Sequence, residues 1–316
     1  MQRIAFIDTV HPVLENGLKK IGFICDNLTE LSKAEILQKI AIYHGIVVRS
    51  RIPIDYEILS RAKSLAFIAR SGAGLENIDV EYCKDREIVL FNAPEGNRNA
   101  VGEQALGMIL SLFNRLSIAD REVRNGEWNR EKNRGVELDG KTVGIIGFGN
   151  NGSAFASKLR GFDVKVLAFD KYKTGYTNSQ VKEVGMDEIF QEADILSLHI
   201  PQNSETIGLF NSEFIEKFRK EIYVVNIARG RIVETSALVK GLKSGKIKGA
   251  CLDVLEYEKS SFEHLFNDSS DMPEPFRFLI ESDKVLLSPH IGGWTHESYY
   301  KLSAVLLNKI KNHYGL

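Results

Sequence analysis

Short apolar segments alternate with amphipathic segments along the chain. The strand-like segments are continuous in apolar residues, as strands covered on both faces are, and they are separated by stretches of helical period such as Pro12–Lys20 and Lys33–Ile40. This alternation predicts βαβ units and a parallel sheet. The strands predicted in this first series are Ile4–Ile7, Gly22–Cys25, Ile46–Val48, Leu65–Ala69 and Ile88–Phe91.

One long helical pattern, from about Ala100 to Arg124, separates this series from a second one. Apolar residues recur there at spacings of three and four without an internal proline, and the polar segment Asn125–Gly140 ends the pattern. The second series closes with a helical segment, Thr295–Tyr314. Its predicted strands are Thr142–Ile146, Val164–Phe169, Ile195–Ile200, Ile222–Ile227, Gly249–Val254 and Val285–Leu287.

Two series of this kind predict an α/β protein with two domains, each a doubly wound parallel sheet, with the ligand in the cleft between them. The length of 316 residues agrees with two domains at ~100–200 residues each. A composition of 43% hydrophobic and 26% charged residues is that of an ordinary globular protein rather than a disordered one.

Charge and cysteine content exclude several classes of function. The 41 Lys and Arg residues nearly balance the 42 Asp and Glu residues, whereas a dedicated nucleic-acid-binding protein has a basic excess. No apolar run approaches the ~18 residues of a membrane span, and the N-terminus is typical of a strand, not of a signal peptide. Cys25, Cys83 and Cys251 are too scattered for a disulfide framework or a zinc site. We therefore expect a cytoplasmic protein with reduced thiols and no bound metal.

A glycine-rich turn between a strand and a helix predicts a dinucleotide site. In the pattern Gly147-x-Gly149-x-x-Gly152, the first glycine permits a tight turn, the second lets a pyrophosphate approach the backbone and the third lets helix and strand pack closely. Free N–H groups at the helix N-terminus would receive the phosphates. Asp170, 18 residues after Gly152, can accept hydrogen bonds from the ribose hydroxyls. This favours NAD over NADP, although the two lysines that follow Asp170 count in the other direction.

Candidate catalytic residues follow strands of the second series, at the carboxyl ends where parallel sheets bind ligands. Arg229 can grip a carboxylate and polarise a carbonyl oxygen, and Arg231 is its rival. His290, which lies between a proline and two glycines, suits a general acid and base, and His199 competes with it. Glu258 by itself is typical of an exposed loop. If it accepts a hydrogen bond from an imidazole, it favours the imidazolium and raises the histidine pKa.

Taken in order, several segments resemble motifs of the D-2-hydroxyacid dehydrogenase family over about residues 49–293. They are Arg49-Ser-Arg51, Arg70-Ser-Gly-Ala-Gly-Leu-Glu-Asn-Ile-Asp79, Asn92-Ala-Pro-x-Gly-Asn97, the glycine-rich turn, Val225-Asn-x-Ala-Arg-Gly230, Leu252-Asp-Val254 and Ser288-Pro-His-Ile-Gly-Gly293.

The resemblance implies a role for each matching residue. Arg229 would bind the substrate carboxylate and carbonyl, His290 would be the acid and base, and Glu258 would be its partner. The implied NAD contacts are Gly147, Gly149, Asn150, Asn151, Gly152, Asp170, His199, Pro201, Thr206, Ile227, Ala228, Asp253, Gly292 and Gly293. The implied substrate contacts are Arg49, Ser50, Arg51, Ser71, Gly72, Ala73, Gly74 and Asn97.

The resemblance also implies an arrangement of domains. A discontinuous, flavodoxin-like substrate domain would comprise residues 1–98 and 289–316, and a Rossmann NAD-binding domain would comprise residues 99–288. The family is usually dimeric, with the long helix after Asn99 at the interface, whereas the plainer interpretation makes it an ordinary core helix. No nucleic-acid or membrane partner is expected.

Within the family, Arg49-Ser-Arg51 and the Phe91-Asn-Ala-Pro segment resemble phosphoglycerate dehydrogenases, in a short form without a C-terminal regulatory domain. The implied reaction is oxidation of 3-phosphoglycerate to 3-phosphohydroxypyruvate, a step of serine biosynthesis. The alternatives are a glyoxylate or hydroxypyruvate reductase, another D-2-hydroxyacid dehydrogenase, and a non-enzymatic NAD-binding regulator.

Four features depart from the family pattern. Asn151 replaces an apolar residue, Lys259 a proline and Trp294 a small residue, and the stretch Lys259–Asp283 is longer than usual. These departures bear on the identity of the substrate more than on hydride transfer.

Overall fold

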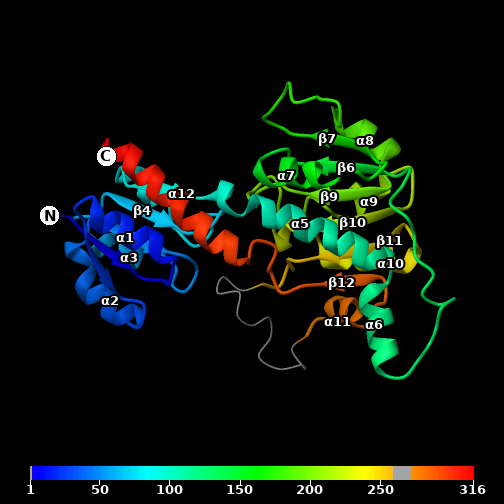
Figure 1. Ribbon diagram of the computed structural model, residues 1–316, viewed down its shortest axis with the longest axis horizontal. Helices are drawn as coiled ribbons and strands as arrows, with labels where there is room; N and C mark the ends of the chain where they lie inside the picture. Colours follow the sequence, from blue (N-terminus) through cyan, green and yellow to red (C-terminus); the bar gives the residue numbers. More distant parts are fainter. Residues whose placement is uncertain (1, 259–271) are drawn as a thin grey trace. The chain divides into compact units, whose positions relative to one another are not determined.

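The computed structural model describes residues 2–258 and 272–316, which form two compact units (Figure 1). One unit contains the chain up to Arg98 and Trp294–Leu316, and the other contains Asn99–Glu258 and the described residues up to Gly293. Lys259 and its neighbours up to residue 271, part of the long stretch noted above, lie outside the described residues.

The chain returns to the first unit at Trp294, five residues later than the boundary expected at residue 289. The physical reason is the buried carboxylate of Asp253 in the second unit. It accepts hydrogen bonds from the backbone N–H groups of Ile291 and Gly292 at 2.9 and 2.8 Å, which tie this segment to the second unit.

The described residues of the first unit form a five-stranded parallel sheet in the order β2-β1-β3-β4-β5. Apolar side chains of α1 and α12 pack on one face, and those of α2, α3 and α4 pack on the other. The strands are β1 (Arg3–Phe6), β2 (Ile24–Asn27), β3 (Gly45–Val48), β4 (Phe67–Arg70) and β5 (Val89–Asn92). The helices are α1 (Pro12–Lys20), α2 (Lys33–Lys39), α3 (Tyr56–Arg61), α4 (Val80–Asp85) and α12 (His296–Tyr314), with a 3-10 turn η1 (Ile40–Ile42).

Short polar side chains fix where the helices of this unit begin. Ser32 and Glu35 form a capping box at α2, in which each side chain bonds the backbone N–H of the other residue. Asp55, Asp79 and Thr295 cap α3, α4 and α12 in the same way, by accepting a backbone N–H of the first turn. These caps satisfy donors that the helices leave without a partner.

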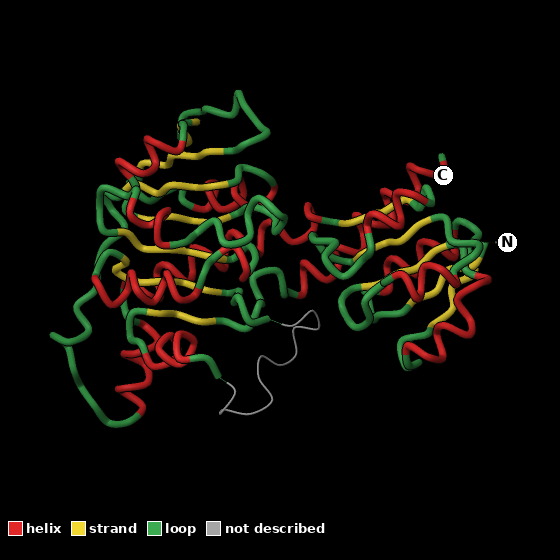
Figure 2. The backbone as a smooth tube through the Cα atoms, turned by 180° about the vertical axis from the view of Figure 1, so that it is seen from behind, coloured by secondary structure: helices red, strands yellow, loops and turns green. Residues whose placement is uncertain are grey.

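In the second unit the described residues form a seven-stranded parallel sheet, in the order β12-β11-β10-β9-β6-β7-β8; Figure 2 shows the strands of each unit side by side. The strands are β6 (Thr142–Ile146), β7 (Lys165–Phe169), β8 (Val181–Glu183), β9 (Ile195–Leu198), β10 (Ile222–Asn226), β11 (Ile247–Leu252) and β12 (Val285–Leu287). The helices are α5 (Pro94–Phe113), which begins in the first unit, α6 (Leu116–Arg124), α7 (Asn150–Lys158), α8 (Met186–Glu192), α9 (Ser212–Glu216), α10 (Thr235–Ser244) and α11 (Glu274–Glu281), with a 3-10 turn η2 (Gly230–Ile232).

The prediction of one helix from Ala100 to Arg124 was wrong. Two helices, α5 and α6, occupy this stretch, and Arg115 between them has a left-handed backbone with φ +52°. The guanidinium of Arg115 donates a hydrogen bond to Asn133 at 3.2 Å and forms an ion pair with Asp283 at 3.7 Å. These tertiary contacts oppose the local helical preference, and the apolar spacing continues across the break, so the sequence pattern does not reveal it.

Strand β8 was missed because two of its three residues are polar. The described part of the chain contains no helix with the length and apolar character of a membrane span.

Two glycines of α5 provide a matched test of its packing. A Cβ at Gly96 would lie 2.8 Å from the backbone of Leu302 in α12, whereas a Cβ at Gly107 would meet nothing within 4 Å. We expect Gly96→Ala to lower the melting temperature, because overpacking costs about 1–3 kcal/mol. Gly107→Ala should raise the melting temperature, because alanine favours a helix over glycine by up to about 1 kcal/mol. Calorimetry of both variants checks this, and equal melting temperatures would refute it.

Candidate active site

The glycine-rich turn connects β6 to α7 and has the form that a dinucleotide pyrophosphate requires. Gly147 has φ +92°, and a Cβ there would lie 2.6 Å from the carbonyl oxygen of His199, so no other residue fits without a shift. A Cβ at Gly152 would overlap the carbonyl oxygen of Gly147, so this glycine lets α7 pack against the turn. Gly149, by contrast, faces open space, which leaves its backbone accessible. These residues fit NAD.

Helix α7 begins at Asn150, between the second and third glycines of the pattern. Asn150 and Asn151 therefore lie in its first turn, where N–H groups are available to a phosphate. The amide oxygen of Asn151 is buried and has no hydrogen-bond partner within the described residues.

Asp170 lies at the end of β7, next to the glycine-rich turn. Its carboxylate accepts a hydrogen bond from the backbone N–H of Phe148 at 2.7 Å and from those of Tyr172 and Lys173 at 2.9 Å each. These three bonds fix the carboxylate at the rim of the turn. This is the position expected for a group that accepts hydrogen bonds from the ribose hydroxyls of NAD.

The two lysines after Asp170 are weaker evidence for binding of NADP than the sequence indicated, because both already have partners within the protein. The ammonium of Lys171 forms an ion pair with Glu205 at 2.6 Å, and the Tyr172 hydroxyl donates to the same carboxylate at 3.3 Å. The ammonium of Lys173 points to the carbonyl oxygen of Phe148 at 3.5 Å. Much of the positive charge near the ribose position is therefore already matched within the protein.

His199 is unsuited to proton transfer near neutral pH. Burial lowers the pKa of its imidazole to about 3, because the charged form is poorly solvated. One ring nitrogen, Nε2, lies 2.8 Å from the Ser197 hydroxyl, and the other, Nδ1, is buried without a partner in the described structure. This removes His199 as the rival of His290. After β9, the Thr206 hydroxyl donates to the carbonyl oxygen of Pro201 at 2.6 Å and closes the loop.

The loop that carries Arg229 is shaped by Asn226, a residue to which the sequence analysis gave no role. Asn226 ends β10 and is fully buried. Its amide accepts a hydrogen bond from the backbone of Ala228 at 3.1 Å and donates one to the carbonyl of Arg229 at 3.0 Å. Ile227 is buried inside this turn. An amide side chain at the end of an otherwise apolar strand was the signal in the sequence that could have revealed the role of Asn226.

Arg229 rather than Arg231 has the setting of a site residue. Arg229 is partly buried, and its guanidinium donates to the carbonyl oxygen of Ala228 at 2.6 Å, whereas Arg231 is exposed on η2. Gly230 between them cannot carry a side chain, because a Cβ would overlap the carbonyl oxygen of Leu255. The Arg229 loop therefore packs directly against the segment that leads to Glu258.

Glu258 and His290 are in direct contact, as the sequence analysis proposed for this pair. A carboxylate oxygen of Glu258 lies 2.7 Å from Nδ1 of His290, and its other oxygen accepts a hydrogen bond from the backbone N–H of Leu255. Both side chains are largely buried. The contact fixes the ring of His290 and directs Nε2 away from Glu258.

Asp253 holds the His290 loop in place. Its side chain is 2% exposed, and in addition to the N–H groups of Ile291 and Gly292 it accepts a hydrogen bond from the Ser288 hydroxyl at 2.5 Å. Gly292 fits closely, since a Cβ there would lie 2.9 Å from the Asp253 carboxylate. Asp253 was expected as an NAD contact, and the structure gives its carboxylate this positioning role. Gly293 is the last residue of the unit.

The sheet order brings together the ends of the three strands that the candidate catalytic residues follow. Strands β10, β11 and β12 are adjacent and parallel, so their carboxyl ends share one edge. Arg229, Glu258 and His290 follow these three strands in that order. The edge continues through β9 to β6, where the glycine-rich turn begins. NAD-binding and candidate catalytic residues therefore occupy one edge of one sheet.

In the first unit, the expected substrate contacts also follow neighbouring strands. Arg49, Ser50 and Arg51 come after β3, and the loop from Ser71 to Gly74 comes after the adjacent β4. The Ala73 carbonyl accepts a hydrogen bond from Asn92 at 2.6 Å, and Gly72 lies against the Arg70 side chain. Asn97 lies in the first turn of α5. The Ser71 hydroxyl and the Asn97 amide oxygen are buried without partners within the described residues.

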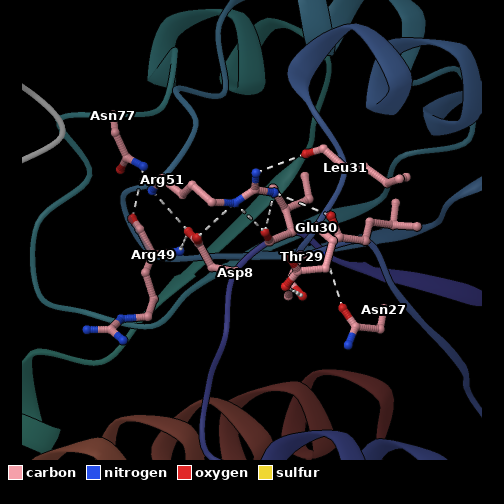
Figure 3. A network of polar contacts seen from close by, with 10 residues as sticks. Asp8, Asn27, Thr29, Glu30, Leu31, Arg49, Arg51 and Asn77 are labelled. Atoms are coloured by element: carbon pink, nitrogen blue, oxygen red, sulfur yellow. Dashed lines mark hydrogen bonds and ion pairs between the residues drawn. The ribbon is translucent and has the colours of Figure 1, made fainter.

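Arg51 does not have the role expected from the sequence. Its three guanidinium nitrogens all donate to backbone carbonyls: Nε and Nη2 to Ile7 at 3.0 and 2.6 Å, and Nη1 to Leu31 at 2.9 Å (Figure 3). It also pairs with the buried carboxylate of Asp8 at 3.5 Å. Arg51 was expected as a substrate contact, and the structure instead commits its donors to the framework of the first unit.

Arg49 extends in another direction. Its backbone N–H donates to Asp8, but its guanidinium points away from Asp8 and Arg51 (Figure 3). Of the two arginines, Arg49 remains the candidate for binding an anion. No group of three or more metal-ligating side chains occurs among the residues that the structure describes.

Comparison with known proteins places this geometry in a family. A family model described as the D-isomer specific 2-hydroxyacid dehydrogenase, NAD binding domain, matches residues 106–292. A D-3-phosphoglycerate dehydrogenase of Archaeoglobus fulgidus is 35% identical over 306 residues, which cover 95% of this chain and 56% of that protein. A hydroxypyruvate reductase of Thermotoga maritima is 35% identical over 286 residues, with 90% of each chain covered.

Solved structures agree with the sequence comparison. A D-lactate dehydrogenase from Aquifex aeolicus, complexed with NAD and lactic acid, has a TM-score of 0.82 at 26% identity and covers 99% of this chain and 97% of its own. The chain spans little more than half the length of the archaeal phosphoglycerate dehydrogenase, 56%, and most of the length of the reductase. The chain belongs to the D-isomer-specific 2-hydroxyacid dehydrogenase family, and its second unit contains the NAD-binding domain of that family.

Proposed function

We propose that this chain is an NAD-dependent oxidoreductase that interconverts a D-2-hydroxy acid and the corresponding 2-oxo acid. The observation that carries the proposal is the contact between Glu258 and His290 at 2.7 Å, on the sheet edge that also carries the glycine-rich turn. A carboxylate that holds one nitrogen of an imidazole leaves the other for proton transfer. A non-enzymatic NAD-binding regulator would need no such pair.

Each residue at this edge has a role in the proposed reaction. Bound NAD supplies the acceptor for a hydride from the hydroxyl-bearing carbon. Nε2 of His290 takes the hydroxyl proton, and the Glu258 carboxylate stabilises the imidazolium that results. Arg229 binds the substrate carboxylate through paired hydrogen bonds and stabilises negative charge on the reacting oxygen.

For the substrate we propose an acid with a second anionic group, with 3-phosphoglycerate as the first candidate, which would place the enzyme in serine biosynthesis. Two observations support it: the resemblance to a phosphoglycerate dehydrogenase and the Arg49 guanidinium, which points away from the carboxylate of Asp8. The commitment of Arg51 to the framework leaves one arginine where two were expected. Hydroxypyruvate is the second candidate, favoured by the relative that this chain matches over 90% of both lengths.

The decisive experiment is a panel of 2-oxo acids assayed by NADH absorbance with wild type and two variants. We expect His290→Ala to lower kcat by about 10²–10⁴-fold, because the proton acceptor is lost. Glu258→Gln should lower kcat less, since a neutral partner still holds the ring but no longer stabilises its charge. NADH binding, followed by its fluorescence, should persist in both variants. Turnover of His290→Ala near that of wild type would remove His290 from the mechanism.

Gly230 provides a test of how closely Arg229 must be placed. Gly230→Ala must move the Arg229 loop away from Leu255, and misplacement of a substrate-binding group by about 1 Å can cost about 10²-fold in rate. We expect kcat/KM to fall about 10–100-fold with little change in NADH affinity. Gly185→Ala is the matched control, because a Cβ there meets nothing within 4 Å. Equal activity of the two variants would contradict this role of the loop.

We propose in addition that the chain forms a homodimer through α6 and the segment after it. Leu116, Val123 and Trp128 expose large apolar side chains along this stretch, and a second copy of the chain would bury them. Light scattering should give twice the chain mass of 35.5 kDa, and Val123→Asp should shift the mass toward one chain. A wild-type mass of one chain would overturn the proposal.

A further inference from the structure

The backbone of Arg49 is fixed from two sides. Its N–H donates to the Asp8 carboxylate at 2.5 Å, and its carbonyl oxygen accepts a hydrogen bond from the Asn77 amide at 2.9 Å (Figure 3). Asp8 is itself buried, at 6% exposed, so it is a rigid anchor. The position from which the Arg49 side chain extends, just after β3, is therefore fixed.

Two aromatic rings of the same unit receive the guanidinium of Arg49. Its central carbon lies 4.2 Å from the centre of the Trp294 ring and 5.9 Å from the centre of the Tyr299 ring. Tyr299 is in turn packed edge-to-face against His11, with ring centres 5.5 Å apart. Trp294 directly precedes Thr295, the residue that caps α12. The aromatic contact is thus built on the start of a stable helix.

Among the residues that the structure describes, no carboxylate pairs directly with the guanidinium of Arg49. Within the described residues, its guanidinium makes no hydrogen bond and no ion pair. Desolvation lowers the pKa of this guanidinium, and the negative charge of Asp8 opposes the shift. Contact with an aromatic face stabilises a cation without occupying its N–H donors, which lie in the plane of the group. Those donors match the oxygens of a phosphoryl group or a carboxylate.

We propose that Trp294 is a positioning residue for substrate recognition: its ring holds the Arg49 guanidinium so that the N–H donors bind a second anionic group of the substrate. The proposal rests on the proposed function. Trp294 is 67% exposed although one face of its ring contacts Arg49, so burial in the core does not explain a tryptophan at this position.

Kinetics on matched substrates test the proposal. Hydroxypyruvate and 3-phosphohydroxypyruvate differ only in the phosphoryl group, and oxaloacetate provides a second carboxylate in its place. We expect Trp294→Ala to raise KM for the phosphorylated acid about tenfold and to leave its kcat nearly unchanged. A similar rise in KM for oxaloacetate would show that the same contact also binds a second carboxylate. KM for hydroxypyruvate, which has no second anionic group, should not change. Trp294→Phe should restore most of the affinity, because it retains an aromatic face.

Tyr56→Ala is the matched control, since Tyr56 is another exposed aromatic residue of the same unit and lies outside the site. It should leave all three KM values unchanged. An equal rise in KM for hydroxypyruvate and its phosphorylated form in Trp294→Ala would overturn the proposal, because it would indicate a general structural role. So would an unchanged KM, or a Trp294→Phe variant that behaves like Trp294→Ala.

A spectroscopic readout separates this proposal from the proposed function. The chain has two tryptophans, so Trp128→Phe leaves Trp294 as the only indole. In this background we expect inorganic phosphate to change the indole emission in a saturable way, and Arg49→Met to abolish the change. The titration needs no turnover, so it remains informative if every acid in the panel is inert. A response that does not saturate, or that persists in Arg49→Met, would refute the contact with the anion.

Discussion

The arrangement of the catalytic edge depends on one buried carboxylate. Asp253 follows β11, and all of its hydrogen bonds described above go to the segment after β12, from Ser288 to Gly292. A buried charge is tolerated only where hydrogen bonds replace its hydration, and here the donors are mostly backbone groups of the loop that carries His290. The carboxylate therefore does not merely sit beneath the loop. It determines the path of the loop, and through it the place at which the imidazole meets Glu258.

The first unit uses the same device for another purpose. Asp8, also buried at the end of a strand, accepts the backbone N–H groups of Arg49 and Arg51 and fixes the turn between them. The two arginines make different contacts. The guanidinium of Arg51 donates to backbone carbonyls, and the guanidinium of Arg49 contacts aromatic rings. A single acidic residue thus lets one short motif supply both a structural cation and a candidate anion-binding cation.

The sequence predicted the centres of the buried strands well, because parallel strands covered on both faces are continuous apolar runs. It predicted the glycine-rich turn, Asp170 and the pair formed by Glu258 and His290 through motif order. It could not separate Arg49 from Arg51, since Arg-Ser-Arg is locally symmetrical and the difference comes from carbonyl groups twenty or more residues away. It also missed the break at Arg115, where tertiary contacts oppose a continuous helical pattern. Long-range polar contacts were the common cause of these errors.

His290 has a left-handed backbone, with φ +55°, a conformation that is uncommon for any residue other than glycine. The hydrogen bonds of Asp253 to the loop hold His290 in this unfavourable conformation, and they offset its conformational cost. The bonds that Asp253 makes to this loop therefore oppose a backbone preference and at the same time hold the imidazole in its place.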